Sequence, residues 1–202
     1  MASTNLYFGY GSNLWRAQMA ARCPDSPFRG IARLRSYRWM INERGYANVA
    51  KTEGDPGPGV WGLVYELAPQ DEAQLDANEG VPVAYEKRLL EVDFWPARGE
   101  EEDPSGGGGG AGRSGTAAPQ QQQRDVVVSM LVYIDFRRVV DSRPKREYVY
   151  RMNRGIDDAL KAGVPVDYVD TVMRRFIADG EDEEAREAAL RQAERFVDDN
   201  TL

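Results

Sequence analysis

Apolar and polar residues alternate along much of the first two thirds of the chain, which is the pattern of half-buried β-strands. One such run begins at Asn5 and breaks at Gly9. A glycine- and proline-rich turn, EGDPGPG, separates two later runs. We expect the further strands in residues 28–42, 46–52, 59–67, 85–97 and 124–136.

Other segments have the longer period of helices. Asn13 is a candidate cap for a short helix that ends before Pro24. Pro69 suits a helix start and Gly80 suits its end. Helical periods follow from about residue 144, from Pro165 and over 181–200. Because the expected strands come first in the chain and the expected helices last, we predict an α+β domain with a curled or closed antiparallel-type sheet and a C-terminal helical segment.

A length of 202 residues suits a single domain, 1–202. Residues 98–124 include five consecutive glycines and four consecutive glutamines, a composition that buries too little apolar surface to fold. We expect a disordered loop there that joins two neighbouring strands, and no domain boundary. The charged helix at 181–200 is expected to pack on the domain with a solvated outer face.

Composition excludes several kinds of chemistry. The chain has no histidine and one cysteine, Cys23, so it cannot build a Ser-His-Asp site, a Cys-His site or a usual zinc site. If the protein is an enzyme, a carboxylate is then the first candidate for acid–base catalysis. A formal net charge of −7 argues against nucleic-acid binding. No membrane-spanning run or leader sequence is evident, so we expect a soluble cytoplasmic protein.

The sequence GYGSN at 9–13 interrupts the first strand just before a helix. A nucleotide loop is disfavoured, because Leu14 replaces the third glycine, no GK[ST] follows, and Arg33 and Arg35 stand where a ribose-binding acid is expected. Two readings remain open. The segment is either a strand-to-helix turn, or a nest in which the amides of residues 10–13 bind an anion or a developing oxyanion.

Glu79 stands at the predicted end of the helix that begins at Pro69. The helix dipole disfavours a carboxylate there, and apolar flanks at 81–83 would raise its pKa further. Both effects favour a general base. An exposed glutamate at a helix end is the alternative. Asp76 shares its face and is expected to support rather than react.

Several motifs together resemble the γ-glutamylcyclotransferases of the cyclotransferase-fold superfamily. They are YFGYGSNL (7–14), ARL (32–34), GVWGLVYEL (59–67), LDANEGV (75–81) and GVPVDY (163–168). The resemblance implies a small mixed or antiparallel β-barrel with flanking helices, no metal and no organic cofactor. It also implies cyclisation of a small-molecule γ-glutamyl substrate, which releases 5-oxoproline and an amine or amino acid.

The same resemblance implies roles for individual residues. Glu79 matches the catalytic glutamate, which takes a proton from the substrate's α-ammonium group and returns it to the leaving nitrogen. Tyr148 matches a tyrosine of the pocket by its spacing from Pro144, with Tyr150 as the alternative. No nucleic-acid or membrane partner is implied, and the oligomeric state is a monomer or a homodimer. The substrate-binding loop corresponds to Tyr7, Phe8, Gly9, Tyr10, Gly11, Ser12 and Asn13.

The substrate is left open by the sequence. Asn13 replaces the leucine typical of the glutathione-specific branch, which favours general γ-glutamyl amino acids. The stretch EYVYRMNRGIDDA is also similar to fungal members associated with sulfur-containing peptide metabolites, so a γ-glutamyl or glutathione-conjugated biosynthetic intermediate is an alternative substrate. A noncatalytic binding module on the same fold is the remaining alternative.

Overall fold

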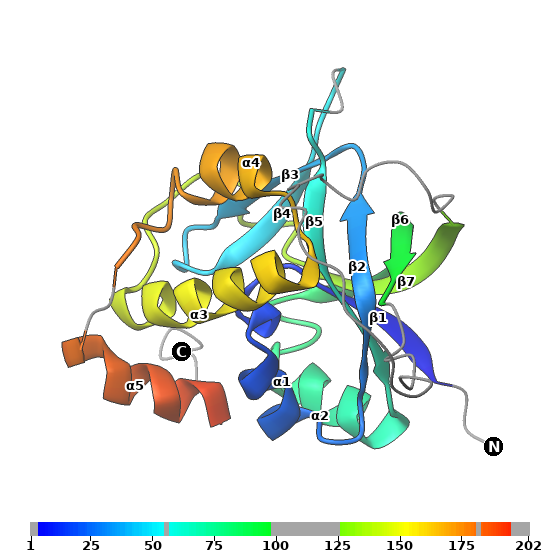
Figure 1. Cartoon of the computed structure of the whole chain (residues 1–202), viewed down its shortest axis with the longest axis horizontal. Coiled ribbons are helices and arrows are strands. Elements are labelled where there is room, and N and C mark those ends of the chain that lie inside the picture. Colours follow the sequence, from blue (N-terminus) through cyan, green and yellow to red (C-terminus); the bar gives the residue numbers. More distant parts are fainter. Residues whose placement is uncertain (1–3, 55–56, 98–125, 181–182, 195–202) are drawn as a thin grey trace, which may run out of the picture.

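The computed structural model describes residues 4–54, 57–97, 126–180 and 183–194, so the predicted insertion at 98–124 lies outside the described residues. Five strands close into a barrel in the order β1-β5-β2-β6-β7 (Figure 1). All neighbours run antiparallel except β1 and β7, whose parallel pairing at Tyr7 and Leu131 closes the barrel. The predicted α+β class and mixed barrel are confirmed. The bounds are β1 (Asn5–Gly9), β2 (Phe28–Leu34), β5 (Val60–Leu67), β6 (Glu86–Pro96) and β7 (Val126–Ile134).

The expected single strand over 28–42 is wrong. The chain turns between β2 and β3, where Ser36 has a φ of +59°, and the next segment leaves the barrel. It pairs with the following strand as a separate two-stranded sheet, β3 (Tyr37–Ile41) and β4 (Ala47–Lys51). Alternation of apolar and polar residues continues on both sides of the turn, so the pattern alone does not reveal the break.

Most helices follow the expected positions. The stretch after Pro165 is an exception, because it forms only a short α-helix and a π-helical turn instead of one continuous helix. The C-terminal helix lies inside the predicted range 181–200, of which residues 181–182 and 195–200 are outside the described residues. The bounds are η1 (Ser12–Leu14), α1 (Arg16–Arg22), α2 (Pro69–Asn78), α3 (Arg146–Ala162), α4 (Val166–Tyr168), η2 (Val169–Met173) and α5 (Glu183–Glu194).

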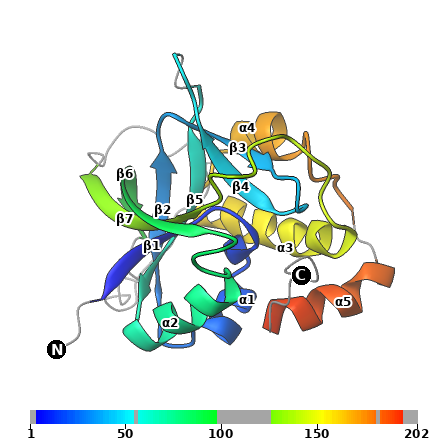
Figure 2. The ribbon, with the colours of Figure 1, turned by 180° about the vertical axis from the view of Figure 1, so that it is seen from behind.

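The helices gather beside the barrel in two layers. Helix α3 lies against the strands, and α5 packs on α3 and α1 on the side away from the barrel (Figures 1 and 2). The buried side chains of α5 are Ala185, Ala189 and Ala193, four residues apart and therefore on one face. Small side chains on this face allow α5 to approach its neighbours closely. The two layers place the C-terminal helix next to the η1–α1 segment.

Candidate active site

A pocket lies where the loop after β1, the end of α2, the β3–β4 sheet and α3 meet. Its empty space is about 480 Å³, open solvent at the mouth included. Six tyrosines and three charged side chains dominate its walls, so it is both aromatic and polar. The lining residues are Tyr7, Tyr10, Gly11, Ser12, Asn13, Arg22, Tyr46, Ala47, Asn78, Glu79, Tyr85, Tyr133, Tyr148 and Arg151.

Most of the residues predicted for the site line this pocket. The exceptions are Phe8 and Gly9. Neighbouring residues of a strand face opposite sides, so Phe8 points away from Tyr7 into the core, where it is fully buried. Tyr148 lines the pocket, whereas its alternative Tyr150 packs against Trp15 outside it. The structure brings together Tyr7, Tyr10, Gly11, Ser12, Asn13, Glu79 and Tyr148.

Asn13 does not cap helix α1, as the sequence suggested. Trp15 is the N-cap residue and no side chain caps the helix. Instead, the Asn13 side chain points into the pocket, where Nδ2 donates to Tyr7 Oη at 2.9 Å and to Glu79 Oε1 at 3.2 Å. Its Oδ1 accepts from Gln18 Nε2 at 2.8 Å and from Arg22 Nη1 at 3.3 Å. These four bonds use the whole amide and fix its orientation.

Two hydroxyl groups of the pocket have their acceptor positions occupied. Ser12 Oγ accepts from Gln18 Nε2 at 3.0 Å and from Arg151 Nη1 at 3.1 Å. Tyr148 Oη accepts from the amides of Ser12 at 3.1 Å and Ala47 at 3.2 Å. Each hydroxyl therefore keeps its own proton for donation to a bound molecule. The expected nest of amides changes accordingly, since the Ser12 amide is hydrogen-bonded to Tyr148.

Gly11 leaves space for the Tyr148 hydroxyl. A Cβ atom at position 11 would lie 2.9 Å from Tyr148 Oη and 3.2 Å from the Cβ of Ala47. Tyr148 is itself buried and hydrogen-bonded to two amides, so its side chain cannot easily shift to make space for a Cβ atom at position 11. The second glycine of GYGSN thus allows the loop to meet the tyrosine of α3.

Glu79 occupies the position that the sequence predicted. It follows the last residue of α2 as the C-cap, and Gly80 then takes the left-handed conformation with a φ of +61°. The residue is half-buried, and its carboxylate accepts the Asn13 hydrogen bond. Burial raises the pKa of the Glu79 carboxyl group, while Arg22, Arg44, the Asn13 hydrogen bond and Arg151 each act to lower that pKa. The net direction of the Glu79 pKa is upward.

The apolar residues that follow Glu79 lie outside the pocket. Val81, Pro82 and Val83 do not line the pocket, and 59% of the Val83 surface is exposed. The carboxylate is instead surrounded by tyrosines from distant parts of the chain, among them Tyr7 and Tyr85, whose pKa values are raised by burial and by the nearby Glu79 charge. The predicted upward direction of the Glu79 pKa agrees with the structure, in which burial is its largest cause.

Sequence reasoning missed the buried cations of the site. Arg22, Arg44 and Arg151 are 5%, 7% and 0% exposed. Arg151 forms a bidentate pair with Glu147, with Nε–Oε2 at 2.9 Å and Nη2–Oε1 at 3.2 Å. The signal for Arg151 is its spacing of three residues from Tyr148, which puts both on one face of an amphipathic helix.

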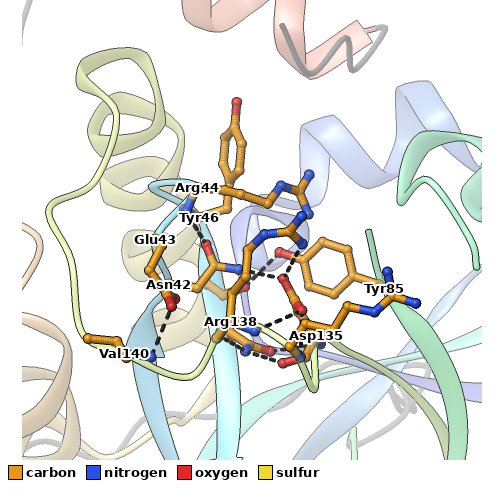
Figure 3. Close-up of polar contacts among 11 residues, drawn as sticks. Asn42, Glu43, Arg44, Tyr46, Tyr85, Asp135, Arg138 and Val140 are labelled. Atoms are coloured by element: carbon orange, nitrogen blue, oxygen red, sulfur yellow. Dashed lines mark hydrogen bonds and ion pairs between the residues drawn. The ribbon is translucent and has the colours of Figure 1, made fainter. Parts of the chain in front are cut away.

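The turn between β3 and β4 carries Arg44 next to Tyr46 and Tyr85, two tyrosines that line the pocket (Figure 3). The Arg44 guanidinium lies 5.6 Å from the ring centre of Tyr46 and 5.3 Å from that of Tyr85. Asn42 anchors the turn, because its Oδ1 accepts from the Arg44 amide and its Nδ2 donates to Asp135 Oδ2, at 3.1 and 3.2 Å. The end of β7 thereby fixes the position of the turn.

The described residues were also compared with the requirements of a metal site and of a membrane-spanning helix. In the part of the chain that the structure describes, no three His, Cys, Asp or Glu side chains are grouped as metal ligands. No helix within the described ranges has the length and apolar character needed to cross a membrane.

Comparisons with known proteins agree with the geometry. Residues 7–105 match the family model described as Gamma-glutamyl cyclotransferase, AIG2-like, a segment that includes Tyr7 to Glu79 but not α3 or α5. Gamma-glutamylcyclotransferases from Mus musculus and Homo sapiens are each 34% identical, over 85 and 83 residues, or 39% and 38% of this chain. The matched part spans 45% and 44% of their lengths, less than half of each.

Solved structures show the same fold. A structure described as Gamma-glutamyl cyclotransferase superposes with a TM-score of 0.63 at 20% identity, covering 94% of this chain and 99% of that one. YkqA from Bacillus subtilis gives a TM-score of 0.58 at 16% identity, over 90% of this chain and 57% of its own.

Proposed function

We propose that this chain, whose residues 7–105 match the family model described as Gamma-glutamyl cyclotransferase, AIG2-like, is a γ-glutamylcyclotransferase that converts a γ-glutamyl compound to 5-oxoproline and a free amine or amino acid. The observation that carries the proposal is the half-buried Glu79 carboxylate, hydrogen-bonded to Asn13 inside a pocket that also presents hydroxyl donors. Supporting it, the reaction requires no histidine, which the chain lacks.

The reaction joins two groups of one molecule. The substrate's α-nitrogen attacks its own γ-carbonyl carbon, a five-membered lactam forms, and the bond to the leaving nitrogen breaks. Nucleophile and electrophile are already linked, so the protein's main task is to hold the γ-glutamyl chain in a folded, near-attack geometry. The enclosed aromatic walls of the pocket suit that task.

Glu79 would move the proton. The substrate's α-ammonium group must lose a proton before it can attack, and the leaving nitrogen must gain one before it departs. A carboxylate whose pKa is raised by burial is a stronger base than an exposed one, and once protonated it is poised to act as the acid. Asn13 holds this carboxylate at one position through the 3.2 Å bond to Oε1.

Ser12 and Tyr148 would stabilise the oxyanion that forms on the γ-carbonyl oxygen. Both hydroxyls already accept two hydrogen bonds from the protein, so their protons are directed away from those partners. Such preorganised donors need no reorientation when charge develops. Arg151, which also lines the pocket, supplies positive potential for the substrate's α-carboxylate.

The test is direct. Purified protein is incubated with γ-glutamyl-alanine, glutathione and γ-glutamyl-lysine, and 5-oxoproline is measured. We expect product from at least one substrate and none from Glu79→Gln, which should remain folded. Glu72→Gln, on the same helix but outside the pocket, is the matched control and should retain turnover. Binding of these compounds without product from the wild type would favour a noncatalytic module instead.

A further inference from the structure

Arg22 connects the pocket with the C-terminal helix. It is the last residue of α1 and is 5% exposed. Its guanidinium donates from Nε to the carbonyl oxygen of Ala193 at 2.8 Å and from Nη2 to that of Gln192, both in α5. From the same guanidinium, Nη1 donates to Asn13 Oδ1 at 3.3 Å. One rigid planar group therefore links α5 to the loop that contacts Glu79.

The position of α5 is itself fixed by packing. Its three buried alanines form one face, and α5 contacts both α3 and α1. Arg146 of α3 adds an exposed ion pair with Glu184 at 2.9 Å. The α5 carbonyls are thus held at a defined distance from Arg22. This helix lies outside the segment that matches the family model, residues 7–105.

The electrostatic surroundings of Glu79 show what Arg22 contributes. The charged groups that act on Glu79 are Arg22 from α1, Arg44 from the β3–β4 turn and Arg151 from α3. Arg22 has the largest lowering effect on the Glu79 pKa among them. Burial lowers the pKa of Arg22 itself to about 10, so it stays charged at neutral pH. The titratable groups that sense the Glu79 charge are Tyr7, Tyr10, Cys23, Tyr85, Tyr133 and Tyr148.

We propose that Arg22 is a positioning residue through which α5 controls the reaction: the α5 carbonyls hold the guanidinium, and the guanidinium holds the Asn13 amide against the Glu79 carboxylate. The inference rests on the proposed function. Arg22 acts through Asn13 and through its charge, and it takes no proton. A loosened α5 would let the guanidinium move, and Asn13 would then lose one of the two acceptor contacts that orient it.

The experiment compares Arg22→Gln, Arg22→Lys and Ala189→Glu in the full chain, with circular dichroism and melting to confirm folding. We expect Arg22→Gln to lower kcat by about 10–100-fold with a smaller change in KM, because a misplaced reacting group costs about that much. Its acid limb of kcat/KM should move to higher pH, since a cation that favours the ionised Glu79 is lost. Ala189→Glu, which displaces α5, should move the acid limb in the same direction. Arg22→Lys keeps the positive charge and should move the acid limb less than Arg22→Gln does.

Arg146→Gln is the matched control, because it weakens the exposed contact of α5 without lining the pocket, and it should keep the wild-type pH profile. The proposal is overturned if Arg22→Gln melts at lower temperature but keeps the wild-type kcat and acid limb, since Arg22 would then be structural only. If the wild type forms no 5-oxoproline, the proposed function fails. The effect of Arg22 on Glu79 is then tested by ¹³C NMR titration of the Glu79 carboxyl group. A titration midpoint in Arg22→Gln equal to that of the wild type overturns the proposal.

Discussion

Replacing Asn13 by leucine tests whether the Asn13 hydrogen bond sets the pKa of Glu79, the proposed base. The substitution keeps a side chain of similar size but removes the donors to Tyr7 and Glu79 and the acceptor for Gln18 and Arg22. The Asn13 hydrogen bond lowers the pKa of Glu79, so its loss must raise that pKa further. Less of the base is ionised at a given acidic pH, and the acid limb of kcat/KM moves to higher pH.

The cost in stability follows from the partners left behind. Gln18 and Arg22 are 1% and 5% exposed, so each loses an acceptor in a place that water reaches poorly. An unsatisfied buried donor costs about 1–3 kcal/mol, and two of them give about 2–6 kcal/mol less free energy of unfolding. The variant is therefore assayed at a temperature well below its melting transition, with folding checked by circular dichroism.

The assay is 5-oxoproline formation across a pH series, with Asn48→Leu as the control. Asn48 is also a fully buried asparagine, but its amide donates to the carbonyl oxygens of Asp135 and Arg138. It should cost comparable stability and leave the acid limb in place. The reasoning is refuted if Asn13→Leu keeps the wild-type limb, or if Asn48→Leu shifts it equally.

Further predictions concern Tyr148, the proposed oxyanion donor, and Glu79, the proposed base. Tyr148→Phe should lower kcat by about 10²–10³-fold through loss of a donor, whereas Tyr150→Phe should stay near wild type, which a kinetic comparison decides. Glu79→Gln should melt at higher temperature than the wild type near neutral pH. The folded-state pKa of Glu79 lies above its ordinary value, so the native state binds the extra proton and the wild type loses stability as pH rises through that range. Thermal melts at about pH 8 should show this advantage, and melts at about pH 4 should not.

The strands and the position of Glu79 were predictable because they depend on local patterns. Alternation identified the barrel strands, and Pro69 with Gly80 identified the limits of the helix that presents Glu79. Alternation did not reveal the turn at Ser36, since the pattern is the same on both sides of it. Alternation also gave no indication that β1 pairs in parallel with β7, because the pairing joins segments more than a hundred residues apart.

The surroundings of Glu79 were not predictable for a related reason. Asn13 has the sequence context of a helix cap, yet a buried network with Gln18 and Arg22 orients it toward Glu79. A buried arginine is uncommon, and Arg22 has no sequence signature, because its partners, such as the Ala193 carbonyl, come from backbone brought close by the fold. Local sequence pattern predicts where Glu79 lies better than it predicts the residues that surround it.

The pocket draws on segments from almost the whole length of the chain, from Tyr7 in the first strand to Arg151 in α3, with α5 behind it. During synthesis, Glu79 and the loop at residues 9–13 leave the ribosome well before α3 does. The Tyr148 hydroxyl that fixes the loop through the Ser12 and Ala47 amides arrives only afterwards. A growing chain therefore has no complete pocket until α3 has been made, and a product that ends before α3 lacks both Tyr148 and Arg151.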